Sequence, residues 1–106
     1  MTKYLVQGSY TVEGVKGVVK EGASSRKATI EKLIKGLGGT MESFYFAFGD
    51  ADVYVIVDLP NNETVAALSM AVNASGAVSI KTTVLMTVEE VDSATKMTVN
   101  YRPPGG

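Results

Sequence analysis

The most informative stretch of the chain is TMESFYFAFGDADVYVIVDL, residues 40–59. Two runs rich in aromatic and β-branched residues, 40–48 and 53–59, flank the tetrad GDAD at 49–52. Aromatic and β-branched residues favour strands, whereas Gly and Asp favour tight turns. Because four residues are too few for another kind of connection, the stretch predicts a β-hairpin.

On the N-terminal side, the sequence predicts a strand, a helical turn and an amphipathic helix. The strand covers residues 3–10, where β-branched, aromatic and polar residues are mixed. Residues 12–20 carry valines at helical spacing, but their two glycines each lower helix propensity by about 1 kcal/mol, so we expect only a short, irregular turn. A loop with a side-chain cap is expected at 22–25. The helix then covers 26–37, where apolar residues recur at i, i+3, i+4 and i+7.

On the C-terminal side, the sequence predicts a second amphipathic helix, a fourth strand and a short third helix. The second helix covers 63–73, and its many small residues would let it pack closely. Apolar and polar residues alternate over 77–88, as in a strand with one buried face. Thr87 and Glu90 have the spacing of a capping box, which predicts a helix through about Lys96.

The predicted order of elements is that of a split βαββαβ arrangement. We therefore expect an α+β, ferredoxin-like fold with a four-stranded antiparallel sheet, a short C-terminal helix and an extended tail. Residues 1–96 would form the single domain, and residues 97–106, with their two prolines, would form the tail. Because this fold carries many unrelated activities, it does not by itself predict a function.

Composition excludes several classes of function. The net charge of -1 gives no basic excess for binding nucleic acid. The chain has neither Cys nor His, which removes the usual thiolate and imidazole ligands, nucleophiles and general bases, so we expect no metal and no cofactor. No apolar run approaches the ~20 residues that span a bilayer, and the N-terminus lacks a signal peptide. We expect a cytoplasmic protein without a membrane partner.

The stretch GGTMESFYFAFGDADVYVIVDLP, residues 38–60, resembles the GYD-domain family of small bacterial proteins, and the similarity extends from about Lys3 to Asp92. In that family a turn containing glycine and a Tyr-Asp pair joins the second and third strands. Gly49 and Asp52 match this motif, whereas Ala51 stands where the Tyr usually does. The resemblance implies a ferredoxin-like, self-associating domain related to the dimeric α+β barrels, and it implies no particular activity.

Two loops contain residues that suit ligands, although each has a simpler structural explanation. Asp50 and Asp52 form a D-x-D pair of the kind that Mg²⁺ or Ca²⁺ accepts, but hairpin turns select the same residues for their backbone geometry. Residues 22–27 offer hydroxyls and two cations for an anion at a helix start. We favour a capped helix with solvated cations there, because caps of this kind are common.

The hairpin turn also predicts which face of the sheet each side chain occupies. Closing the hairpin evenly around Asp50 and Ala51 gives two sets of pairs. One face would hold Phe48–Val53, Phe46–Val55 and Phe44–Val57, and the other Ala47–Tyr54, Tyr45–Ile56 and Ser43–Asp58. We expect the Phe face, including Phe46, to lie in the core under the helices that contain Leu33 and Leu68. Ser43, Tyr45, Tyr54 and Asp58 would then form a pocket or a subunit interface.

Three functions are compatible with these features. The sequence favours a non-catalytic homo-oligomer that serves in assembly or binds a small molecule, and it assigns no catalytic residue. A cofactor-independent enzyme of the dimeric α+β barrel type, such as a monooxygenase or lactone isomerase, would need an activated Tyr, Asp or water. A regulatory protein similar to the PII signalling proteins would need a long nucleotide-binding loop, and the predicted loops are short.

Overall fold

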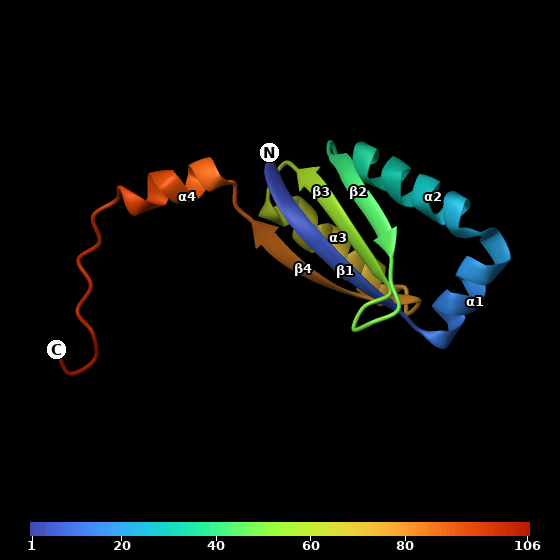
Figure 1. Ribbon diagram of the computed structural model, residues 1–106. Helices are drawn as coiled ribbons and strands as arrows, with labels where there is room; N and C mark the ends of the chain where they lie inside the picture. Colours follow the sequence, from blue (N-terminus) through green and yellow to red (C-terminus); the bar gives the residue numbers. More distant parts are fainter.

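The computed structural model describes residues 1–106 and contains one antiparallel sheet of four strands, with helices packed on one of its faces (Figure 1). The elements in chain order are β1 (Thr2–Tyr10), α1 (Val12–Glu21), α2 (Ala23–Gly36), β2 (Thr40–Phe46), β3 (Val53–Leu59), α3 (Asn62–Ala74), β4 (Val78–Leu85) and α4 (Val88–Thr95). The strand order is β2-β3-β1-β4. The predicted α+β, ferredoxin-like fold is confirmed, with α1 as an additional helix before α2.

The core lies between the sheet and helices α2 and α3. Strand β3 shows why: its odd-numbered residues, from Val53 to Leu59, are buried, whereas the residues between them are only partly covered. Tyr4 of β1 is fully buried in the same layer, and its hydroxyl donates a hydrogen bond of 2.6 Å to Asn62 Oδ1 at the start of α3. Strand alternation therefore gives the sheet one helix-covered face and one face that no helix covers, which we call the open face.

Helix α1 is a regular helix of ten residues, so the prediction of a short, irregular turn was wrong. The Thr11 side chain caps it by accepting a hydrogen bond from the Gly14 amide. Gly14 is buried against the loop before β4, where an added Cβ would lie only 2.0 Å from the Ala77 carbonyl oxygen. The glycine that lowers helix propensity thus permits a close contact with a distant segment, and that contact fixes the helix in place.

Helix α2 begins earlier than expected. It starts at Ala23 rather than Arg26, and Ser24 and Ser25 lie within its first turn instead of capping it. The residue before the helix is Gly22, whose φ of 90° is a conformation that other residues rarely adopt, and no side chain caps the helix there. The expected cap is replaced by a tight connection between α1 and α2.

The β2–β3 hairpin differs from the evenly closed hairpin expected from sequence. Its strands pair Phe46 with Val53, Tyr45 with Tyr54 and Phe44 with Val55, which is two residues away from the predicted register. The connecting loop consequently spans residues 47–52 rather than the tetrad alone. Because side chains alternate with a period of two, a shift of two residues leaves the side chains that remain in the paired strands on their predicted face.

The hairpin shifts because Asp52 is held by β1. The Asp52 amide donates to the Gly8 carbonyl oxygen at 2.8 Å, and Asp52 Oδ2 accepts from the Tyr10 amide at 2.8 Å. Phe48 therefore lies in the loop and is fully exposed. Phe46, at the end of β2, has 39% of its surface exposed to solvent. Only Phe44 packs against the core, so the prediction that all three Phe side chains lie under the helices was wrong for Phe46 and Phe48.

Helix α4 and the tail extend away from the rest of the chain (Figure 1). The predicted capping box is present, with the Thr87 and Glu90 side chains and amides bonded reciprocally. No residue of α4 is buried, and residues 96–106 are exposed. The radius of gyration is 17.1 Å, whereas a compact domain of this length has about 13 Å. Residues 86–106 form a projecting segment, which we call the C-terminal arm.

We expect Gly14→Ala to lower the free energy of unfolding by at least about 2 kcal/mol, because the new methyl group would overlap the Ala77 carbonyl. Gly17→Ala is the matched control, since no atom lies within 4 Å of its Cβ position. That change should raise the free energy of unfolding by about 0.5–1 kcal/mol. Urea unfolding at one protein concentration measures both, and equal effects would contradict the close contact at Gly14.

The revised register predicts a graded series for the three Phe side chains. Phe44→Ala should cost about 2–4 kcal/mol of unfolding free energy, because Phe44 packs under the helices. Phe46→Ala should lower the free energy of unfolding by less, about 1–2 kcal/mol. Phe48→Ala should change it by no more than about 0.5 kcal/mol. Urea unfolding of the three variants measures these losses. A larger loss of unfolding free energy for Phe48→Ala than for Phe44→Ala would support the evenly closed hairpin instead.

Candidate functional site

The open face carries all four site residues that the sequence predicted. Its side chains alternate with those of the core, and the strand register identifies them. They are Lys3, Leu5, Gln7 and Ser9 of β1, Ser43 and Tyr45 of β2, Tyr54, Ile56 and Asp58 of β3, and Ser79, Lys81, Thr83 and Leu85 of β4. Ser43, Tyr45, Tyr54 and Asp58 therefore share a face, as expected.

The pairing of these four residues differs from the predicted one. Tyr45 stands directly opposite Tyr54, Ser43 opposite Ile56, and Asp58 opposite Thr40. Tyr45 is largely exposed, whereas Tyr54 is half-buried between its neighbours. The two tyrosines thus form a neighbouring aromatic pair on the open face, and Ser43 and Asp58 are not brought together.

Asp58 belongs to a small charge cluster that the sequence did not predict. Lys3 Nζ lies 3.1 Å from Asp58 Oδ2 and 3.0 Å from Glu42 Oε2. A bulge between Met41 and Ser43 leaves Glu42 out of the β2–β3 pairing. The hydrogen bonds to Glu42 and then to Asp58 raise the pKa of the Lys3 amine. Because the β1–β3 register joins residues 55 positions apart, only the tertiary structure reveals this cluster.

The turn that carries Gly49 and Asp52 has a structural role in this chain. The Asp52 carboxylate accepts a hydrogen bond from the Tyr10 amide, and the neighbouring Ala51 is buried. Gly49 lies in open space, since nothing approaches its Cβ position within 4 Å. The structure contains no group of three or more carboxylate, His or Cys side chains that could hold a metal ion. Within the D-x-D pair, Asp52 connects the hairpin to β1 through its amide and its carboxylate.

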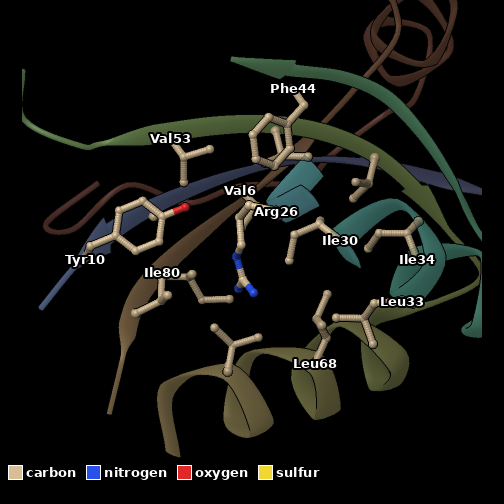
Figure 2. A pocket seen from close by; sticks show the side chains of 15 residues that line it. Val6, Tyr10, Arg26, Ile30, Leu33, Ile34, Phe44, Val53, Leu68 and Ile80 are labelled. Carbon is tan, nitrogen blue, oxygen red and sulfur yellow. The ribbon is translucent and has the colours of Figure 1, made fainter. Parts of the chain in front are cut away.

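A cavity lies on the other side of the sheet, beneath α2 and α3 (Figure 2). Its volume is about 60 Å³, and 13 of its 15 lining residues are hydrophobic. The walls come from all four strands and from both helices, and include Phe44, Val55, Ile30 and Leu68. Sequence reasoning assigned these residues to the core and missed the space between them, because periodicity gives the direction of a side chain and not how completely neighbours fill the gap.

The cavity adjoins a wider groove between α2 and α3. The two helices pack on the sheet but make few contacts with each other. The groove has a volume of about 500 Å³, and eight of its ten lining residues are hydrophobic, among them Leu33, Leu37, Ala67 and Ala71. The small residues of α3 were expected to allow close packing, but Ala67 and Ala71 face this groove and are exposed.

Arg26 is the charged residue among those that line the cavity and the groove. It lines the cavity, the groove and a third hollow of about 130 Å³ between α1 and α2. In Figure 2 its side chain extends into the space between the sheet and α3. A solvated cation was expected at this position, whereas Arg26 is partly buried and lines all three spaces.

Tyr10 lies next to Arg26 at the end of β1. It lines the same cavity, and Figure 2 shows its hydroxyl directed toward the interior. Burial raises the pKa of the Tyr10 phenol, whereas the positive charge of Arg26 and its side-chain interaction with the phenol act in the opposite direction. The net increase keeps Tyr10 protonated at neutral pH, so its hydroxyl is available as a hydrogen-bond donor.

Comparison with known proteins gives a family but no characterised relative. No curated protein and no solved structure matches the chain. None of its helices combines the length and the apolar character needed to cross a membrane. The model of the GYD domain matches residues 4–95, which cover the sheet from Tyr4 of β1 onward and all four helices. The chain therefore belongs to the GYD domain family.

Proposed function

We propose that this protein is a non-catalytic homo-oligomer that binds a small, largely apolar molecule between its sheet and its helices. The observation that carries the proposal is the separation of α2 and α3, which leaves an apolar cavity open to a groove of about 500 Å³. Binding sites for small molecules are typically apolar hollows of ~300–1,000 Å³ with a few polar groups. The groove has this size and this character.

The chemistry of the groove supports binding rather than catalysis. A cofactor-independent enzyme would need a group that accepts a proton, but the raised pKa of Tyr10 keeps the phenol protonated. Arg26 remains positively charged and can only donate hydrogen bonds. Asp58 lies on the open face and is paired with Lys3. Tyr10 and Arg26 can orient a ligand, and neither of them is poised as a base.

The surface area supports self-association. The isolated chain exposes 7359 Å². A compact monomer of 11.2 kDa would expose about 5,700 Å² by the usual scaling of surface with mass. The excess of about 1,700 Å² exceeds the roughly 800 Å² that each partner buries in a standard interface. A second copy of the chain can cover this excess, because the open face and the C-terminal arm are both uncovered.

The composition of the open face suits contact with a second copy. Leu5, Ile56 and Leu85 provide aliphatic surface, and Tyr45 and Tyr54 provide aromatic surface. Tyrosine is enriched at subunit interfaces, where its ring packs and its hydroxyl remains hydrated. The face thus combines apolar area with a few polar groups, as stable interfaces do.

The C-terminal arm adds a second apolar surface. Its exposed hydrophobic residues are Met86, Val88, Val91, Met97, Val99 and Tyr101. Within its own chain the arm buries nothing, so its apolar residues gain cover only from a neighbour. An arm that lies across the partner copy would join this surface to the open face, which begins at the adjoining end of β4.

We expect native mass spectrometry at micromolar concentration to give a multiple of the 11.2 kDa chain mass. Tyr54→Ala should weaken the assembly by roughly tenfold or more, because central aromatic residues contribute most at interfaces. Phe48→Ala is the matched control, since it removes an exposed aromatic ring from a loop outside the open face. A wild-type chain that remains monomeric would contradict self-association, and equal effects of the two variants would exclude the open face as the interface.

Ligand binding is tested with N-phenyl-1-naphthylamine, a neutral fluorescent probe whose emission rises in apolar surroundings. We expect saturable enhancement with the wild-type chain. Ala71→Trp should weaken binding by roughly tenfold or more, because the indole would occupy the groove. Ala66→Trp is the control on the same helix, at an exposed position outside the groove. Equal probe binding by both variants would contradict a site between α2 and α3.

A further inference from the structure

We propose that the molecule held between the sheet and the helices is an amphipathic monocarboxylate. Its carboxylate would be bound by Arg26 and Tyr10, and its apolar body would lie in the groove between α2 and α3. This inference rests on the proposed binding function and adds the chemical class of the ligand. It follows from the charge, the direction and the surroundings of these two side chains.

Arg26 forms no ion pair, and the cavity and the groove that it lines have mostly apolar walls. The ion pairs of the chain involve Lys3 and Lys16, so no carboxylate lies within 4.0 Å of the Arg26 guanidinium. Partial burial of an unpaired charge costs free energy, and a bound anion would recover it. The planar guanidinium presents paired N–H donors that match the two oxygens of a carboxylate. Arg26 thus favours an anion with a flat, bidentate head group.

Tyr10 provides a second donor at the same place. Its hydroxyl points toward the interior beside Arg26 (Figure 2), and its phenol stays protonated at neutral pH. The hydrogen bond from the Tyr10 amide to Asp52 Oδ2, at 2.8 Å, holds the backbone of this residue in place. A neutral hydroxyl and a guanidinium facing one cavity can both donate to the same carboxylate.

The walls around Arg26 determine where the rest of the ligand lies. The hollow between α1 and α2 is lined by Glu13 and Glu21, and the charge of Glu21 also acts on Tyr10. A second negative charge would be repelled on that side. The groove on the other side of Arg26 is lined by Leu33, Leu68 and other apolar residues. A single carboxylate with an apolar body therefore fits, whereas a dicarboxylate does not.

The two volumes set the shape of the ligand. The cavity of about 60 Å³ is too small for a whole ligand and accepts only the end of a chain or ring. The groove of about 500 Å³ lies within the range of small-molecule sites. The cavity and the groove share the lining residues Arg26, Leu33, Leu68, Val72 and Val78, and Arg26 is the charged member of this shared wall. The ligand would have its charged end at this wall.

The inference is tested by isothermal titration of the full chain with three probes of equal length: octanoate, 1-octanol and octylammonium. We expect octanoate to bind roughly 10- to 100-fold more tightly than 1-octanol, the usual gain from a charge-assisted hydrogen-bonded pair. Octylammonium should bind most weakly because it meets Arg26. Equal affinity for octanoate and 1-octanol would overturn the carboxylate assignment and leave the apolar site intact, whereas failure of all three to bind would contradict both proposals.

Variants separate a role of Arg26 in binding from a role in folding. Arg26→Gln should weaken octanoate binding roughly 10- to 100-fold and change 1-octanol binding much less, and Tyr10→Phe should weaken octanoate binding several-fold. Lys27→Gln is the matched control, since it removes an exposed positive charge next to Arg26 on the same helix. Circular dichroism establishes that each variant is folded. Equal losses of octanoate binding in the Arg26 and Lys27 variants would show a general charge effect and overturn the proposed site.

Discussion

Asp52 joins the β2–β3 hairpin to the end of β1, and the arrangement of both faces of the sheet depends on this contact. Its amide and its carboxylate bond to the backbone of Gly8 and Tyr10, two residues of one strand. Because Asp52 is committed to β1, the hairpin closes over a six-residue loop and Phe48 leaves the sheet. The same contact fixes the backbone of Tyr10, which lines the cavity. A residue of the family turn is thus connected to the candidate ligand site through the central strand.

The two faces of the sheet carry different kinds of side chain. On the helix side, apolar side chains from every strand meet two helices that stand apart, so the layer is apolar without being completely filled. On the open side, Lys3 lies between Glu42 and Asp58 and holds charges from three strands together. The bulge in β2 leaves Glu42 out of the β2–β3 pairing and allows its carboxylate to reach Lys3. The separation of apolar and charged groups follows directly from strand alternation.

Local patterns in the sequence were sufficient for the order of the elements, for the kind of each element except α1, and for the face of the sheet that the strand residues occupy. Tyr45 and Tyr54 were assigned to the correct face although their pairing was wrong, because an error of two residues preserves the alternation. What local patterns could not supply depends on contacts between distant residues. The Ala77 carbonyl requires a glycine at position 14, and the hairpin register depends on β1. Arg26 lines a cavity whose other walls come from distant strands. The cavity was missed for the same reason, since it is defined by how far two helices stand apart.

The pairing of β1 with β4 has a consequence for how the chain reaches its native state. Strand β1 occupies the interior of the sheet, and one of its two neighbours is the last strand to be synthesised, with Lys3 opposite Leu85. Until β4 has left the ribosome, the corresponding edge of β1 has no partner, so the N-terminal half cannot complete the sheet by itself. Pairings of such large sequence separation slow folding, and they leave an unpaired strand edge accessible to other chains in the meantime. The polar side chains Lys81 and Thr83 of β4 are added only when this edge is finally closed.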